Sequence, residues 1–117
     1  MATINLTSEE FKKKFFDYTK TQEWSYDGDK PAIIDFYADW CGPCQALAPV
    51  LEDLSNEYEG KLDIYKVDTE KEGELSRVFG IRSIPTMLFI PKTGQPMMQP
   101  GALPKTTLEE VIQKELL

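Results

Sequence analysis

Cys41 and Cys44 are the chain's only cysteines, and they stand three positions apart in the stretch DWCGPCQ. Such a pair can bind a metal, attach haem, form a structural disulfide or act as a reactive dithiol. A structural zinc site needs four ligands, usually Cys or His, and this chain has no histidine. Zinc would therefore require a dimer that shares four thiolates, and an iron–sulfur cluster fails on the same ligand count. Covalent haem attachment requires His after the second cysteine, where this chain has Gln45.

A reactive dithiol is the remaining interpretation of the pair. A structural disulfide that closes so short a loop contributes little, because loop-closure entropy grows with loop length. Cys41 stands where a strand-like run meets a helix-like stretch, with Pro43 in a position that helix starts favour. The helix dipole stabilises a thiolate there. We therefore expect Cys41, exposed at the helix start, to attack, and Cys44, one turn inside, to resolve the mixed disulfide.

Length and composition set broad limits on the protein. Its 117 residues, 41% of them hydrophobic, can form a single domain with a real core over 1–117. The net charge of −7 and the acids beside Lys12–Lys14 argue against nucleic acid and membrane surfaces as partners. No stretch approaches the ~20 apolar residues that cross a bilayer. The first residues do not resemble a signal peptide, so we expect a cytoplasmic protein, or a periplasmic one if a signal segment has been removed.

Hydrophobic periodicity predicts alternating strands and helices. Thr7 and Glu10 have the spacing of a capping box, which predicts a helix with Phe11, Phe15 and Tyr18 on one face. The other expected elements are an edge strand at 3–6, a strand at 32–38, a helix at 41–58 kinked at Pro49, a strand at 62–68, a helix at 72–79, an antiparallel hairpin of 86–90 and 95–99, and a final helix from about Pro104. The strand–helix–strand order predicts a right-handed βαβ unit with a parallel strand pair.

Several short motifs together resemble one family. They are WCGPC at 40–44, Asp35 six residues before the first cysteine, KVD at 66–68, IP at 84–85 and PGAL at 100–103. In order and spacing they resemble the thioredoxin family from about residue 31 to the end of the chain. A lone CxxC motif is moderate support, whereas this combination is highly specific.

The resemblance implies a thioredoxin fold of the α/β class. About five strands form one central mixed sheet flanked by about four helices, with a βαβ unit followed by a ββα unit. It also implies a protein-disulfide reductase without a bound cofactor, working as a monomer through a redox-active disulfide. Its partners would be disulfide-containing proteins and an electron donor such as a thioredoxin reductase. The alternatives are a non-catalytic binding module and an oxidising or isomerising relative, although the Gly-Pro dipeptide is typical of reducing members.

This chain departs from the family's common pattern in three places. Gln45 stands where Lys is frequent, and Tyr37 stands where Trp is frequent. The segment 18–30 is longer than in compact members. These departures bear on the partner reductase and the compartment and leave the dithiol chemistry intact.

Asp35 lies inside the apolar run IIDFY, where a charge is costly without a partner or a function. A structural carboxylate that bonds nearby backbone or faces solvent is one interpretation. The other, which the resemblance also implies, is a buried carboxyl with a raised pKa that acts as general base toward Cys44. Lys66 alternates with apolar residues along its strand, so it either tunes Asp35 or extends its ammonium group to the surface.

The resemblance also implies a substrate-binding surface around Cys41. It implies a cis peptide bond between Ile84 and Pro85, although most X–Pro bonds are trans. Ile84 would then lie against the cysteines as a docking edge for substrate. The other expected members of this surface are Trp40, Gly42, Pro43, Gly101 and Ala102.

Overall fold

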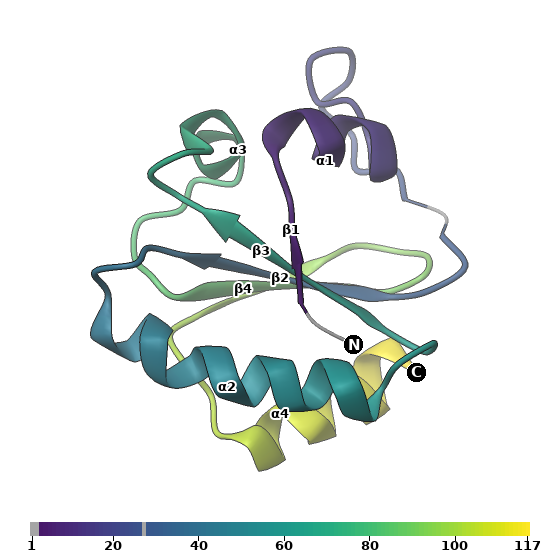
Figure 1. Cartoon of the computed structure of the whole chain (residues 1–117). Helices are drawn as coiled ribbons and strands as arrows, with labels where there is room; N and C mark the ends of the chain where they lie inside the picture. Colours follow the sequence, from purple (N-terminus) through teal and green to yellow (C-terminus); the bar gives the residue numbers. More distant parts are fainter. Residues whose placement is uncertain (1–2, 27) are drawn as a thin grey trace.

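A computed structural model describes residues 3–26 and 28–117 of the chain (Figure 1). Over these residues, five strands form one sheet in the order β1-β3-β2-β4-β5. The strands are β1 (Ile4–Asn5), β2 (Ala32–Tyr37), β3 (Asp63–Asp68), β4 (Thr86–Ile90) and β5 (Met97–Pro100). The helices are α1 (Ser8–Lys14), α2 (Gly42–Glu57), α3 (Gly73–Val78) and α4 (Lys105–Val111), and a π-helical turn, η1 (Ile112–Leu116), continues α4.

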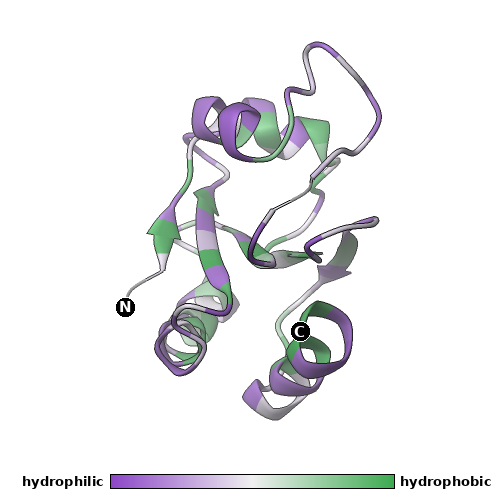
Figure 2. Ribbon diagram, turned by 90° about the vertical axis from the view of Figure 1, so that its right-hand side faces the viewer, coloured by the Kyte–Doolittle hydropathy of each residue, from purple (hydrophilic) through white to green (hydrophobic). Residues whose placement is uncertain are grey.

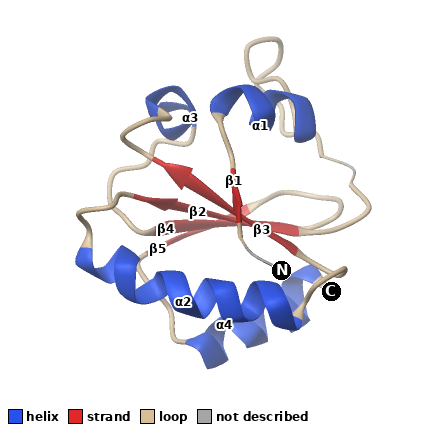
Figure 3. Cartoon of the chain, in the orientation of Figure 1, coloured by secondary structure: helices blue, strands red, loops and turns tan. Residues whose placement is uncertain are grey.

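The sheet is mixed, as the sequence predicted. Strand β3 pairs in parallel with both β1 and β2, and β2–α2–β3 forms the expected βαβ unit. Strand β4 runs antiparallel to β2 and to β5, so β4, β5 and α4 form the ββα unit. Figure 3 shows α1 and α3 on one side of the sheet and α2 and α4 on the other. This arrangement confirms the predicted thioredoxin fold.

Each face of the sheet has its own core. Figure 2 shows hydrophobic residues in the helices on both sides of the sheet. The core toward α1 and α3 is aromatic: Phe11 stacks on Phe15 with ring centroids 4.9 Å apart and meets Phe79 edge to face. The core toward α2 and α4 is mostly aliphatic, and Ile33 of β2 belongs to it. Because side chains alternate along a strand, Asp35 lies on the same face as Ile33, the face that α2 covers.

The predicted capping box at the start of α1 is confirmed. The Thr7 hydroxyl accepts from the Glu10 amide at 3.1 Å, and the Glu10 carboxylate accepts from the Thr7 amide at 2.9 Å. The prediction that Tyr18 shares this helix is wrong, since α1 ends at Lys14. The Asp17 carboxylate accepts from the Thr19 amide, a local turn that competes with helix.

The remaining element predictions hold with small shifts at the ends. Strand β4 has the predicted bounds, whereas β5 starts at Met97, after Pro96. Helix α2 continues through Pro49, so the kink there stays a prediction. Gly80 follows α3 with φ +61, a conformation that glycine adopts without strain. Within the described residues, no helix is both long and apolar enough to span a membrane.

Candidate active site

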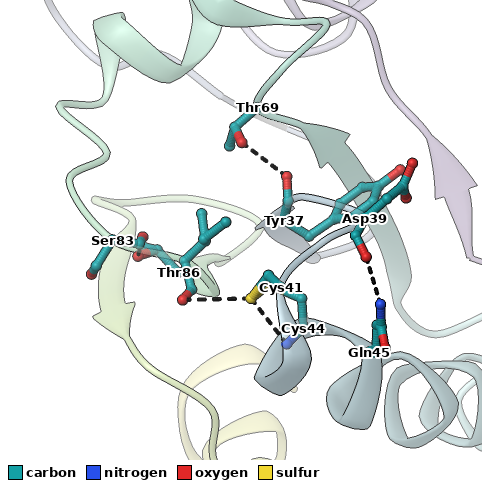
Figure 4. Close-up of a disulfide and its surroundings, with 9 residues drawn as sticks. Tyr37, Asp39, Cys41, Cys44, Gln45, Thr69, Ser83 and Thr86 are labelled. Atoms are coloured by element: carbon teal, nitrogen blue, oxygen red, sulfur yellow. Dashed lines mark hydrogen bonds between the residues drawn. A yellow bond between two sulfur atoms is a disulfide. The ribbon is translucent and has the colours of Figure 1, made fainter.

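The two cysteines lie at the start of α2 and form a disulfide (Figure 4). Cys41 is the N-cap residue, and its Sγ accepts a hydrogen bond from the Cys44 amide at 3.2 Å. Pro43 occupies the first turn, where its missing N–H costs no helical hydrogen bond. The N-cap position therefore directs an unpaired amide and the positive end of the helix dipole at one sulfur, that of Cys41.

The prediction that Cys41 is exposed is wrong for the disulfide form. Cys41 is 5% exposed and Cys44 is 3% exposed, so exposure hardly distinguishes the two residues. A segment distant in the sequence covers Cys41: the carbonyl oxygen of Ile84 lies 3.8 Å from its Sγ. The residues next to the cysteines in the sequence do not predict this contact.

The Ile84–Pro85 peptide bond is cis, as the resemblance implied. Pro85 is buried, and its carbonyl accepts from the amide of Gly101 at 2.8 Å. Gly101 has φ +86, a conformation that an L side chain would strain. This hydrogen bond attaches the turn that holds Gly101 and exposed Ala102 to the loop beside the disulfide.

Trp40, Gly42 and Pro43 are exposed next to the disulfide. Trp40 is 69% exposed, which excludes a core role for this large aromatic side chain. The residues predicted for the substrate-binding surface thus lie at the start of α2, in the loop before β4 and in the turn after β5. Their role in binding stays a prediction.

Asp35 is fully buried, and neither carboxyl oxygen accepts a hydrogen bond from any described residue. The structure therefore contradicts the interpretation in which Asp35 bonds nearby backbone or faces solvent. Burial raises the pKa of Asp35 to about 6, and the charge of Lys66 opposes this shift. A carboxyl that titrates this close to neutral pH can both accept and return a proton.

Lys66 combines parts of both predicted behaviours. It is half-buried and is the register partner of Asp35 on β3. Its Nζ lies 4.3 Å from the ring centroid of Tyr37, within range of a cation–π interaction. Lys66 and Cys44 also line one pocket of about 320 Å³ at the base of α2. The ammonium group thus acts on Asp35 through space and contacts Tyr37 directly.

Two polar side chains near the site were not assigned a role from the sequence. The amide Nε2 of Gln45 donates to the backbone carbonyl of Asp39 at 2.6 Å, which ties α2 to the loop before Cys41. The hydroxyl of Thr86 donates to the Ser83 carbonyl at 2.7 Å, which braces the loop around Ile84 (Figure 4). Their closeness in sequence to WCGPC and IP was the available signal.

Among residues 3–26 and 28–117, no group of three or more His, Cys, Asp or Glu side chains is placed to hold a metal ion.

Comparison with known proteins identifies the family. The family model described as Thioredoxin matches residues 3–114. A thioredoxin of Borreliella burgdorferi is 52% identical over 110 residues, which cover 94% of each chain. The chain belongs to the thioredoxin family. Thioredoxin 1 of Nostoc sp. is 45% identical over 91 residues, covering 77% of this chain and 84% of the relative.

A solved structure supports the same fold. The crystal structure of chloroplastic thioredoxin z superposes with a TM-score of 0.80 at 27% identity, covering 97% of this chain and 94% of the other. Thioredoxins are thiol–disulfide oxidoreductases, and the Cys41–Cys44 pair supplies the redox-active disulfide. The protein is therefore a protein-disulfide reductase.

Proposed function

We propose that Cys41 is the attacking thiolate and Cys44 the resolving thiol. The observation that carries this assignment is the hydrogen bond from the Cys44 amide to the Sγ of Cys41 at the N-cap of α2. In the reduced protein this donor and the helix dipole stabilise negative charge on Cys41. Cys44 lies within the first turn and lacks that N-cap position.

The reaction proceeds through two exchanges. The Cys41 thiolate attacks one sulfur of the substrate disulfide, whose S–S bond breaks and releases one substrate thiolate. Cys44 then loses its proton and attacks the Sγ of Cys41, which releases the second substrate thiolate and forms the Cys41–Cys44 disulfide. The substrate gains two electrons, and the protein loses two.

Asp35 is the general base that accepts the proton of Cys44. Its burial on the face of β2 that α2 covers and its pKa of about 6 support this role. The chain has no histidine, so a carboxyl is the natural acceptor near neutral pH. Lys66 tunes this carboxyl by holding its pKa lower than burial alone would.

The substrate polypeptide binds on the surface around the disulfide. None of its residues is charged, Trp40, Gly42, Pro43 and Ala102 are exposed, and the Ile84 carbonyl lies beside the sulfur of Cys41, which supports this assignment. The proposed members are Trp40, Gly42, Pro43, Ile84, Pro85, Gly101 and Ala102.

The protein acts as a single domain over 1–117 and as a monomer in the cytoplasm, with the periplasm as the alternative. Its substrates are disulfide-containing proteins, and its electrons come from a thioredoxin reductase or another donor. Neither nucleic acid nor a membrane is a partner. The net charge of −7 supports this set of partners.

Trapping of the mixed disulfide tests the cysteine roles. Cys44→Ser should accumulate a covalent adduct with insulin on Cys41, whereas Cys41→Ser should trap none. Asp35→Asn should slow release of the adduct in the intact protein. An adduct on Cys44 by mass spectrometry would reverse the two roles, and absence of insulin reduction by the wild-type protein would favour a binding module.

A further inference from the structure

Arg77 and Arg82 are the only arginines of this acidic chain, and both line the same pocket. The pocket has a volume of about 360 Å³ and lies beside the active site, because Trp40 and Ile84 form part of its wall. We call it the arginine pocket. Its other lining residues are Thr69, Gly73, Ser76, Ile81 and Ser83.

The two arginines line the pocket from different elements. Arg77 lies in the last turn of α3, and its Nη1 lies 3.2 Å from the position that a Cβ on Gly73 would occupy. A glycine at the start of α3 therefore leaves room for this guanidinium to lie over the helix. Arg82 lies two residues before Ile84, in the loop that leads to the disulfide, and is exposed.

The charge of the arginine pocket is opposite to that of the whole protein. Its lining has two guanidinium groups and no carboxylate, whereas the chain has a net charge of −7. The acid within α3, Glu74, accepts a hydrogen bond from the Tyr18 hydroxyl and pairs with Lys12 at 3.6 Å, and it does not line the pocket. Arg77 acts on Glu74 only as a through-space charge.

Both guanidinium groups are available to a ligand. Over residues 3–26 and 28–117, neither forms a hydrogen bond or a salt bridge. A guanidinium binds a carboxylate through two parallel hydrogen bonds, and a lysine ammonium does not reproduce that geometry. Two unpaired arginines beside an exposed indole thus suit an acidic side chain on a polypeptide.

We propose that the arginine pocket binds a Glu or Asp side chain of the substrate polypeptide close to the disulfide under attack. This inference rests on the proposed attack by Cys41. Ile84 supplies both a wall of the pocket and the carbonyl oxygen 3.8 Å from the Sγ of Cys41. An extended chain advances about 3.3–3.6 Å per residue, so three residues on either side of the substrate cysteine span about 10–11 Å, and we place the acid within that window.

This pocket would decide which acidic substrates the protein accepts. The net negative charge of the protein repels acidic segments at long range. Two local guanidinium groups offset that repulsion only when the acid reaches the pocket. Position relative to the substrate cysteine, and not acidity alone, is therefore the feature that is recognised.

Paired peptide substrates test the proposal. Each peptide carries one disulfide and either Glu or its neutral isostere Gln at one of the three positions on either side of a cysteine. For at least one position, wild-type kcat/KM should favour Glu over Gln by about threefold to tenfold, as expected for two partly exposed charge pairs. Arg77→Gln with Arg82→Gln should abolish this preference and leave the rate on the Gln peptide unchanged.

Three controls sharpen the result. Lys114→Gln, an exposed residue on η1, makes the same type of charge change away from the site and should keep the preference. Replacing both arginines with Lys should retain part of it, because charge remains and the two-pronged geometry is lost. Salt at about 0.5 M should weaken the wild-type preference by screening.

Three outcomes would overturn the proposal: no Glu preference at any position, a preference that survives in the double Gln variant, or an equal loss on both peptides. The last outcome would assign the arginines a structural role. If the wild-type protein reduced neither peptide, the proposed attack by Cys41 would fail instead, so the two failures are distinguishable.

Discussion

Asp35 and Lys66 are register partners on the neighbouring parallel strands β2 and β3, yet they form no hydrogen bond. The ammonium group of Lys66 lies over the ring of Tyr37, and no described residue donates a hydrogen bond to the buried Asp35 carboxyl. Attraction through space therefore offsets only part of the desolvation of the carboxylate. This incomplete compensation leaves the pKa of Asp35 at about 6, so at neutral pH the carboxyl is mostly ionised and can still take up a proton readily.

Asp35→Asn should stabilise the protein above about pH 6 by roughly 2–3 kcal/mol. The folded pKa is about 6, whereas the unfolded value is about 3.9. Below about pH 4 the carboxyl of Asp35 is protonated in both the folded and the unfolded state, so it does not lower the free energy of unfolding. As pH rises from about 4 to about 6, the unfolded chain ionises first, so the wild-type stability falls.

Denaturant melts of the oxidised protein at pH 4 and pH 8 measure this effect. The gain should be present at pH 8 and absent at pH 4. Asp53→Asn, on the exposed side of α2, is the matched control and should show no such gain. If Asp35→Asn were less stable and fully active, Asp35 would be an ordinary structural carboxylate and its role as general base would be refuted.

Lys66→Gln should raise the pKa of Asp35 further, because the neighbouring positive charge lowers it. Less of the carboxyl would then be ionised at neutral pH, so the acid limb of the pH–rate profile for insulin reduction should move to higher pH. NMR titration of the Asp35 carboxyl carbon reports the same shift directly. An unmoved titration, with Lys71→Gln as the control, would limit Lys66 to its contact with Tyr37.

Gln45→Ala should loosen the loop before Cys41, since it removes the hydrogen bond from Gln45 to the Asp39 carbonyl. We expect a loss of about 0.5–1.5 kcal/mol in stability. The Cys41 amide, which donates to the Ala38 carbonyl, should exchange its hydrogen faster. Gln45→Lys retains a hydrogen-bond donor and should restore the protection of the Cys41 amide from exchange. Equal exchange of this amide in the wild type and both variants would show that Gln45 does not hold the loop.

The reduction potential of the Cys41–Cys44 pair should lie near the thioredoxin value of about −270 mV. The reason is the family's Gly-Pro dipeptide between the cysteines, which is typical of its reducing members. Equilibration with glutathione, followed by quantification of both forms, measures the potential. A value between about −180 and −120 mV would place the protein with the isomerases and oxidases.

Features that depend on neighbours in the chain were determined by the sequence itself. The capping box of Thr7 and Glu10 and the bounds of β4 follow from local spacing and periodicity, and both match the structure. The count of possible metal and haem ligands around Cys41 and Cys44 likewise depends on residue types alone. Even the burial of Asp35 was predictable, because apolar residues surround it in one strand.

Features that depend on contacts between distant segments were decided only by the tertiary structure. The family resemblance placed Ile84 against the cysteines, but only the packing leaves its carbonyl oxygen 3.8 Å from the Sγ of Cys41 and Cys41 itself 5% exposed, which made the predicted exposure of Cys41 wrong. No sequence motif marked Arg77 and Arg82, which α3 and the following loop bring beside Trp40. The physical reason is that local patterns specify which face of an element is apolar, whereas the packing of those faces determines which side chains from separate elements meet.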